Sequence, residues 1–333
     1  MTSSHVVQIS MFPDEHSPRA STSSALFGIS WSYSRRSTLN QCARKYYYEY
    51  FGANKRAAEQ EPMKEQLRFL KLLQNRNERT GKILHTAIST FLRKSREGVI
   101  WNVDRLVGWA CEIFHKDIDY SRIHPDMDQP LLGKYPPVLL REYHYRDSNA
   151  DVLCEEATTR LATALRSFCT DVRYQEFREA GTKIGAEIER HLKLIDFPIA
   201  AEGVVDLAFP TIQGATVVDW KIGNDDKSGD ESLQLAVYAL WARDYFHSGP
   251  ESLRVCKVHL TSGTIVDFRS DAAVLSAARV RIFQDAELMQ TVEEYGENGV
   301  ADAFSPCLKP FVCRECSFLK ACPEGRMIIH DRN

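Results

Sequence analysis

Three charged residues interrupt two otherwise apolar stretches in the middle of the chain. Asp206 lies in the run VVDLAF, while Asp219 and Lys221 lie in ATVVDWKI, and the intervening TIQG is typical of a turn. Apolar and β-branched runs of this kind predict two strands buried on both faces. Because side chains alternate along a strand, Asp219 and Lys221 share a face, and a hairpin would bring Asp206 near Asp219.

Two kinds of chemistry fit these three residues. A divalent cation held by Asp206 and Asp219, with Lys221 beside it, could activate a water and stabilise charge developing on a phosphate. Alternatively, Asp219 and Lys221 form a buried ion pair with a structural role only, since an unpaired buried carboxylate is costly. From this D-x-K stretch alone, the ion pair is the favoured interpretation, so the choice depends on the rest of the chain.

Further signatures surround these strands in a fixed order. They are SYSRRSTLNQCARKYYYEY, GKILH, AEIE, QLAVY and a C-terminal C-x2-C-x5-C pattern. Together with GVVDLAF and VVDWKIG, they resemble the PD-(D/E)xK nucleases, specifically the RecB-like branch with an iron–sulfur cluster. That branch includes the AddB nuclease domain and the CRISPR-associated adaptation exonucleases. The resemblance runs from about Ser32 to Pro323 and rests on the order and spacing of motifs that are individually weak.

The resemblance implies a metal-dependent active site. In it His85, the histidine of GxxxH, holds one or two Mg²⁺ or Mn²⁺ ions together with Asp206 and Asp219. The backbone carbonyl of Trp220 completes the shell, and Lys221 orients or deprotonates the attacking water. Imidazole is a common ligand for Mn²⁺ and a less usual one for Mg²⁺. A lone helical histidine is more often structural, so the role of His85 depends on the resemblance.

The resemblance adds three supporting positions to this site. Glu187 fits the glutamate that the family places on the first strand of its core, with Glu189 close behind. Gln234 and Tyr238 are four residues apart and share a helical face, which resembles the family's Q-x-x-x-Y motif for positioning DNA or the lysine. Alternatively, the glutamates face solvent, and the Gln–Tyr pair is a surface glutamine above a packed tyrosine.

Nine cysteines in a chain without an export signal are typical of a reducing cytosol, where clustered thiols bind metal more often than they pair. Two ligand sets are available. The resemblance favours a [4Fe–4S] cluster, expected to be structural, held by Cys42, Cys313, Cys316 and Cys322; Cys42 would then staple the N-terminal helix to the C-terminus. Alternatively, Cys307 replaces Cys42 in a local Zn²⁺ site.

The charge distribution is uneven although the net charge is only −3. Residues 31–96 contain 15 Lys or Arg against 5 Asp or Glu, which is compatible with a phosphate-binding face or with solvated helix surfaces. A helix is predicted from Ser34 to Tyr50. Its basic and aromatic residues could contact a nucleic-acid strand, but we expect most of its tyrosines to lie in the core.

The N-terminal residues 1–28 are polar, and we expect a mobile tail. Within it, Gln8, Met11 and Phe12 resemble the short peptide with which bacterial repair proteins dock on the sliding clamp. An incidental apolar patch is the alternative. The chain has no bilayer-spanning apolar run and no secretory signal, which predicts a cytoplasmic protein without membrane contact.

These observations predict one nuclease domain over residues 29–326, with a helical insertion at about 100–180 and a Cys-rich segment at 307–323. The expected fold is α/β, a mixed central sheet flanked by helices as in restriction endonucleases. The expected function is Mg²⁺- or Mn²⁺-dependent hydrolysis of DNA by an exonuclease acting on single strands or ends, in repair or recombination. No G-x-x-x-x-G-K-[ST] motif occurs, so a helicase would be a partner. The alternatives are a catalytically weak iron–sulfur scaffold subunit that binds DNA and, less favoured, a zinc-stabilised interaction module.

Overall fold

The computed structural model describes residues 30–54, 63–129, 136–194, 200–223, 231–297 and 301–330. The chain divides into two compact units. Of the described residues, 34–54, 63–71, 287–297 and 301–330 belong to unit 1, and 30–33, 72–129, 136–194, 200–223 and 231–286 belong to unit 2. Among the described helices, none is long and apolar enough to cross a bilayer.

Unit 2 contains a six-stranded sheet. Its strands are β1 (Ser30–Trp31), β2 (Glu187–Lys193), β3 (Ala200–Pro210), β4 (Ala215–Lys221), β5 (Leu253–His259) and β6 (Thr264–Phe268). The order is β1-β3-β4-β5-β6, with β2 paired to β3. The β1–β3 and β4–β5 pairs are parallel and the others are antiparallel. This mixed sheet flanked by helices confirms the predicted α/β class.

The two strands that carry the central aspartates form the predicted hairpin. Leu207 pairs with Val218, so that Asp206 falls opposite Asp219 across the two strands. The turn requires the glycine at position 214, because a Cβ added there would lie 2.1 Å from the carbonyl oxygen of Ser252. A tight turn in contact with a neighbouring backbone therefore fixes the register that brings the carboxylates together.

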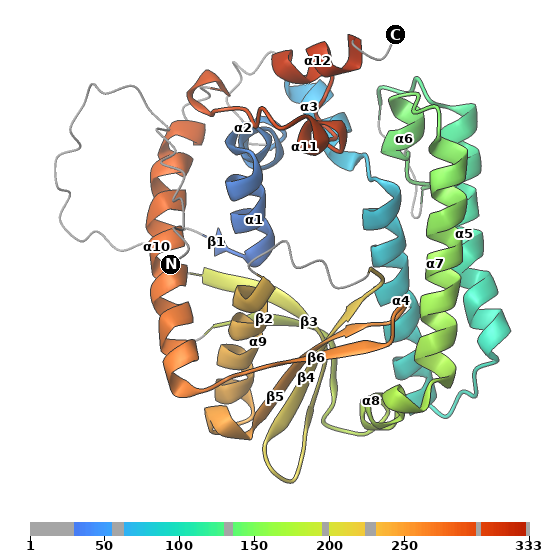
Figure 1. Ribbon diagram of the computed structural model, residues 1–333, viewed down its shortest axis with the longest axis vertical. Coiled ribbons are helices and arrows are strands. Elements are labelled where there is room, and N and C mark those ends of the chain that lie inside the picture. The colour runs from blue at the N-terminus through green and yellow to red at the C-terminus, as the bar shows by residue number, and fades with distance from the viewer. Residues whose placement is uncertain are drawn as a thin grey trace, which may run out of the picture. The chain divides into compact units, whose positions relative to one another are not determined.

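Helices α4 (Arg76–Arg96) and α8 (Gln175–Gly181) contact β2 and β3 of this sheet, respectively, and α9 (Glu231–Tyr245) contacts β4, β5 and β6. Helices α5 (Val103–Ile123), α6 (Arg141–His144) and α7 (Ala150–Thr170) also belong to unit 2. Helices α4, α5 and α7 lie side by side (Figure 1). Trp220 packs against Phe168 of α7 and Phe177 of α8, with ring centroids 5.4 and 5.7 Å apart. Alternation along β4 therefore turns Asp219 to the opposite face, where α9 lies against β4 and β5.

The N-terminal helical region of unit 1 differs from the single helix predicted over residues 34–50. It consists of α1 (Tyr33–Gln41), α2 (Ala43–Tyr47) and a π-helical turn (Tyr48–Gly52). The break is at Cys42, whose backbone is extended at φ −162° and whose Sγ accepts the Lys45 N–H at 3.4 Å. Cys42 thus caps α2, a position that interior helix periodicity does not reveal.

The tyrosines that follow Cys42 pack against the C-terminal segment of the same unit. The rings of Tyr47 and Phe304 lie 5.0 Å apart, and those of Tyr48 and Phe318 lie 5.6 Å apart. Tyr46, Tyr47 and Tyr48 are each at most 1% exposed, which confirms that most of this aromatic run is core. The remaining helices of the chain are α3 (Lys64–Leu72), α10 (Ala272–Glu297), α11 (Pro310–Arg314) and α12 (Pro323–His330).

Candidate active site

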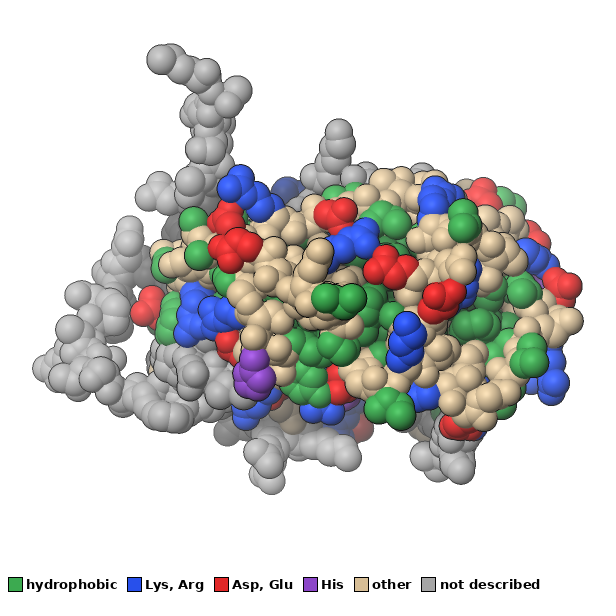
Figure 2. Space-filling model, turned by 90° about the horizontal axis from the view of Figure 1, so that it is seen from below, with side chains coloured by type: hydrophobic (Ala, Val, Ile, Leu, Met, Phe, Trp, Pro, Cys, Tyr) green, Lys and Arg blue, Asp and Glu red, His purple; other side chains and the backbone are tan. Residues whose placement is uncertain are grey.

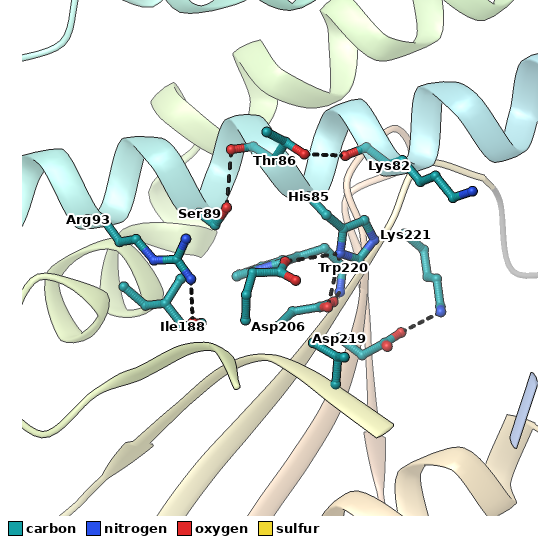
Figure 3. A network of polar contacts seen from close by, with 12 residues as sticks. Lys82, His85, Thr86, Ser89, Arg93, Ile188, Asp206, Asp219, Trp220 and Lys221 are labelled. Carbon is teal, nitrogen blue, oxygen red and sulfur yellow. Dashed lines mark hydrogen bonds and ion pairs between the residues drawn. The ribbon is translucent and has the colours of Figure 1, made fainter. Parts of the chain in front are cut away.

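The carboxylate of Asp206 contacts two other elements of the candidate site in unit 2. It is buried in β3, and its Oδ2 accepts the backbone N–H of Trp220 at 2.7 Å. Its Oδ1 lies 3.0 Å from Nδ1 of His85, which α4 supplies (Figure 3). One carboxylate thus links β4 and α4.

A third group joins this pair from β2. The Oε1 of Glu189 lies 3.6 Å from His85 Nδ1. One ligand atom from each of His85, Glu189 and Asp206 lies within 4.8 Å of the others, which is a spacing that could hold a metal ion. Carboxylate oxygens suit Mg²⁺ and Mn²⁺, and imidazole suits Mn²⁺ in particular, so the donor set fits the metal expected from the sequence.

The histidine and the aspartate of this site shift each other's protonation. Burial opposes the charged imidazole, but Asp206 and Glu189 outweigh that effect and raise the pKa of His85 to about 10. Burial also raises the pKa of Asp206, while the His85 cation opposes that shift. At neutral pH the Nδ1–H of His85 therefore donates to Asp206, and a metal ion at this position must displace that proton.

The lysine of the D-x-K stretch faces the neighbouring aspartate. Lys221 Nζ lies 2.8 Å from Oδ2 of Asp219, which is 2% exposed (Figure 3). Burial disfavours the ammonium form, but Asp219 and Asp206 outweigh it and raise the pKa of Lys221. The lysine therefore carries its positive charge at neutral pH.

Helix α9 brings the glutamine and tyrosine of the Q-x-x-x-Y pattern onto the same aspartate. Gln234 Nε2 and the Tyr238 hydroxyl each lie 3.4 Å from Asp219 Oδ1. Gln234 Nε2 donates to the Tyr238 hydroxyl at 2.8 Å, and that hydroxyl donates to the Val204 carbonyl at 2.8 Å. Both side chains thus support Asp219 rather than standing on the helix surface.

The two strand glutamates, Glu187 and Glu189, have different partners. Glu187 accepts a hydrogen bond from the Tyr245 hydroxyl and lies 3.8 Å from Arg190. Glu189 is the one that the structure brings to His85. Glu189 also has a φ of +50° inside the strand, a backbone conformation that the sequence pattern does not predict.

A groove of about 660 Å³ runs along α4 beside these residues. It is lined by Asn77, Glu78, Gly81, Lys82, His85, Thr86, Ser89, Thr90, Arg93, Glu189, Val204 and Asp206. Another hollow of about 700 Å³ lies at the β3–β4 turn and includes Phe209 and Ile212. Viewed from that end, hydrophobic, acidic and basic side chains are interspersed (Figure 2). The groove along α4 is the hollow that reaches the candidate metal ligands.

Several buried or bonded groups near the site were not singled out from the sequence. Lys257 and His259 of β5 are buried and pair in register with Asp219 and Lys221. Charged and polar residues inside the apolar run LRVCKVHL were the available signal. Arg93 of α4 donates to the backbone of β2 and had no local signature in the sequence.

All five candidate cluster cysteines belong to unit 1. The Cys307 N–H donates to Cys42 Sγ at 3.3 Å, and the Cys313 thiol donates to the Cys307 carbonyl at 2.8 Å. Burial raises the pKa of Cys316 to about 12 and that of Cys322 to about 11. Because Cys42 and Cys307 both lie in unit 1 and contact each other, the arrangement is compatible with either predicted ligand set. The predicted clamp-binding residues Gln8, Met11 and Phe12 lie outside the described part of the chain.

Comparison with known proteins bears on the family. No curated protein matches the chain. A solved structure described as "Crystal structure of SSO0001" is similar at 14% identity and a TM-score of 0.29, over 56% of this chain and 81% of that one, a similarity too low to support an argument. The family model of the PD-(D/E)XK nuclease superfamily matches residues 30–323, which include every candidate active-site residue. The chain therefore belongs to the PD-(D/E)XK nuclease superfamily.

Proposed function

We propose that this protein is a metal-dependent DNA nuclease whose active centre lies where α4 meets β2, β3 and β4. The observation that carries the proposal is the convergence of His85, Glu189 and Asp206 within 4.8 Å, beside the Asp219–Lys221 pair. Members of the superfamily are typically nucleases that depend on divalent metals, and this donor set suits such an ion.

In the proposed mechanism, His85, Glu189, Asp206 and Asp219 would hold one or two Mg²⁺ or Mn²⁺ ions. When bound, the metal would act as a Lewis acid and lower the pKa of a water. To offer a neutral imidazole to the metal, His85 would release its proton to solvent. The Lys221 ammonium, held beside Asp219 at 2.8 Å, offsets the charge that develops on the phosphate.

The helix α9 pair has a positioning role in this proposal. Gln234 and Tyr238 each contact Asp219 from α9, and they are held there by their bond to each other and by the bond from Tyr238 to the Val204 carbonyl. These contacts restrict the rotamer of the Asp219 carboxylate. Gln234 and Tyr238 would therefore orient a metal ligand and would not read DNA bases directly. Glu187, bonded to Tyr245, would act only through the geometry of β2.

The proposed substrate is single-stranded DNA or a DNA end, cut exonucleolytically during repair or recombination. The support is the resemblance of the ordered motifs to the RecB-like branch. The groove along α4 adds hydroxyl and amine groups beside the ligands, including Thr86, Thr90 and Lys82, which are groups that contact phosphates. Helicase and sliding-clamp partners stay predictions from the sequence.

The proposal is tested by incubating the full chain, with Mg²⁺ or Mn²⁺, with end-labelled single-stranded, double-stranded and circular DNA. Progressive shortening of linear single strands, absent in chelator and in Asp206→Asn, is expected. Cutting of circular DNA, which has no ends, would show that the protein is an endonuclease and not an exonuclease. Binding of DNA without cutting in any metal would favour the catalytically weak scaffold subunit instead.

We also propose that Cys42, Cys313, Cys316 and Cys322 hold a structural [4Fe–4S] cluster. The support is their common place in unit 1 and the backbone N–H groups that point at sulfur, from Lys45 to Cys42 and from Phe318 to Cys316. Such N–H···S bonds stabilise cluster thiolates. The alternative is Zn²⁺ with Cys307 in place of Cys42.

A further inference from the structure

Among the described residues, three non-glycine residues adopt positive φ: Arg146, Glu189 and His247. Arg146 follows the end of α6, and His247 follows the end of α9. A left-handed residue just past a helix end is a common way to terminate the helix. Glu189, at φ +50°, instead lies inside strand β2, where termination gives no reason for it.

The backbone at Glu189 is turned without a change of register. Ile188 pairs with Leu207 on one side, and Arg190 pairs with Val205 on the other, so Glu189 falls opposite Asp206. A left-handed conformation is unfavourable for a residue with a Cβ and persists only where surrounding contacts impose it. The carboxylate of this residue lies 3.6 Å from His85 Nδ1.

One contact from α4 falls on the peptide next to this residue. The Arg93 guanidinium donates from Nη2 to the carbonyl oxygen of Ile188 at 2.8 Å (Figure 3). Arg93 lies eight residues after His85, and both residues line the groove along α4. The same helix thus supplies a candidate ligand and a donor that fixes the carbonyl immediately before Glu189.

We propose that Arg93 is a positioning residue for the metal site: its bond to the Ile188 carbonyl holds β2 in the left-handed turn that directs Glu189 to His85 and Asp206. The proposal rests on the proposed function, because it assumes that these three residues bind a divalent cation. In this proposal, the unfavourable left-handed conformation of Glu189 serves to form the metal site.

A neighbouring arginine provides a matched control. Arg96 of α4 donates to the carbonyl oxygens of Gly181 at 3.0 Å and Ala186 at 2.9 Å. It therefore links α4 to the same edge of unit 2 with two bonds, but neither bond involves the peptide that precedes Glu189. Loss of Arg96 should weaken the link between α4 and β2 and leave the turn at Glu189 unchanged.

The test is Mn²⁺ binding to the full-length protein, measured by calorimetry or by the electron paramagnetic resonance signal of free Mn²⁺. Arg93→Met and Glu189→Gln should each weaken binding by about 10-fold or more, as loss of a ligand or its supporting partner does. Arg96→Met should change it less than about twofold. Adding Arg93→Met to Glu189→Gln should have no further effect if Arg93 acts through Glu189.

Replacing Glu189 by glycine separates backbone from carboxylate, because glycine adopts positive φ without a steric penalty. Glu189→Gly should bind Mn²⁺ as weakly as Glu189→Gln and melt at the same temperature as the wild type or higher. A lower melting temperature with unchanged Mn²⁺ affinity would show that the turn serves stability only, which would overturn the proposal.

Other outcomes separate this proposal from the proposed function. If the wild type neither binds Mn²⁺ nor cuts DNA, the proposed function fails. If the wild type does both and Arg93→Met matches it in Mn²⁺ affinity, only the role of Arg93 fails. Weaker DNA binding by Arg93→Met in chelator, with unchanged Mn²⁺ affinity, would assign this groove residue to the substrate and overturn its positioning role.

Discussion

At the scale of single residues, the two aspartates of the site have different partners. Asp206 is occupied by His85 and by the backbone of Trp220, whereas Asp219 is paired with Lys221 and approached by Gln234. The neighbouring cations offset the cost of burying the carboxylates in the absence of metal. Polar partners of this kind hold the carboxylates of the candidate site in place.

Removal of the positive charge of Lys221 should slow DNA cleavage strongly and leave DNA binding largely unchanged. Lys221→Met is expected to lower the cleavage rate by roughly 10²- to 10⁴-fold, because its ammonium no longer offsets charge on the phosphate. Asp219→Asn should do the same by weakening metal binding. DNA affinity, measured by fluorescence anisotropy in Ca²⁺, should change little for both; its loss would mean that these residues hold the fold.

Metal binding should depend on pH in one direction. The pKa of His85 is raised to about 10 in the metal-free site, so its proton is bound below that pH and competes with the metal. Mn²⁺ affinity should therefore rise by about tenfold per pH unit from pH 6 towards 9, with release of about one proton. Calorimetry in buffers of different ionisation enthalpy measures that proton, and a pH-independent affinity would contradict the assignment of His85.

At the scale of elements, α4 is the helix on which the site depends. Two buried carboxylates of the neighbouring helical region hold its N-terminal turns. Glu142 Oε1 accepts from the backbone N–H and the guanidinium of Arg76 at 3.0 and 2.8 Å. Asp117 Oδ2 accepts from Arg79 Nε at 2.6 Å. The helices of residues 103–181 therefore fix the helix that presents His85.

Loss of one of these carboxylates should lower the stability of the folded protein substantially. Glu142 is 0% exposed, and Glu142→Ala leaves the Arg76 guanidinium without its partner, so the free energy of unfolding should fall by roughly 3–5 kcal/mol. Urea unfolding followed by circular dichroism measures it. The control is Glu97→Ala, which breaks an exposed pair with Lys94 and should cost less than about 1 kcal/mol. Equal effects would show that α4 is held by apolar packing alone.

At the scale of the whole chain, segments from near its two ends build unit 1. The backbone N–H of Arg44 donates to the Ser305 carbonyl at 3.1 Å, and its Nε donates to the Phe304 carbonyl at 2.7 Å. Contacts between such distant segments are entropically costly to close. A cluster ligated by Cys42 would add a covalent link at the same place, which makes unit 1 the part most sensitive to metal content.

The two ligand sets differ in one cysteine, and iron analysis of two variants separates them. Anaerobically purified wild type should contain about four irons per chain and absorb near ~400 nm. Cys42→Ser should lose most of this iron and melt at a lower temperature, whereas Cys307→Ser should keep it. Iron retained in Cys42→Ser but lost in Cys307→Ser would reverse the assignment. A colourless wild type with about one zinc would support the local zinc site.

Much of the fold followed from patterns that repeat locally. The apolar runs around Asp206 and Asp219 predicted paired strands, because two short apolar, β-branched runs separated by a glycine-containing turn leave few other arrangements. The four-residue spacing of Gln234 and Tyr238 placed both on one helical face. The interruption at Cys42 was missed, since a sulfur that caps the next helix leaves the surrounding helix propensity unchanged.

The sequence by itself determined the family, the α/β class and the place of Asp206, Asp219 and Lys221 on paired strands, because each depends on residue type and short spacing. Only the tertiary structure decided between Glu187 and Glu189. That choice depends on φ at one residue, on a register shared with β3 and on a donor from Arg93 on α4. Contacts between segments far apart in the chain impose this backbone conformation, and local sequence preference alone disfavours it.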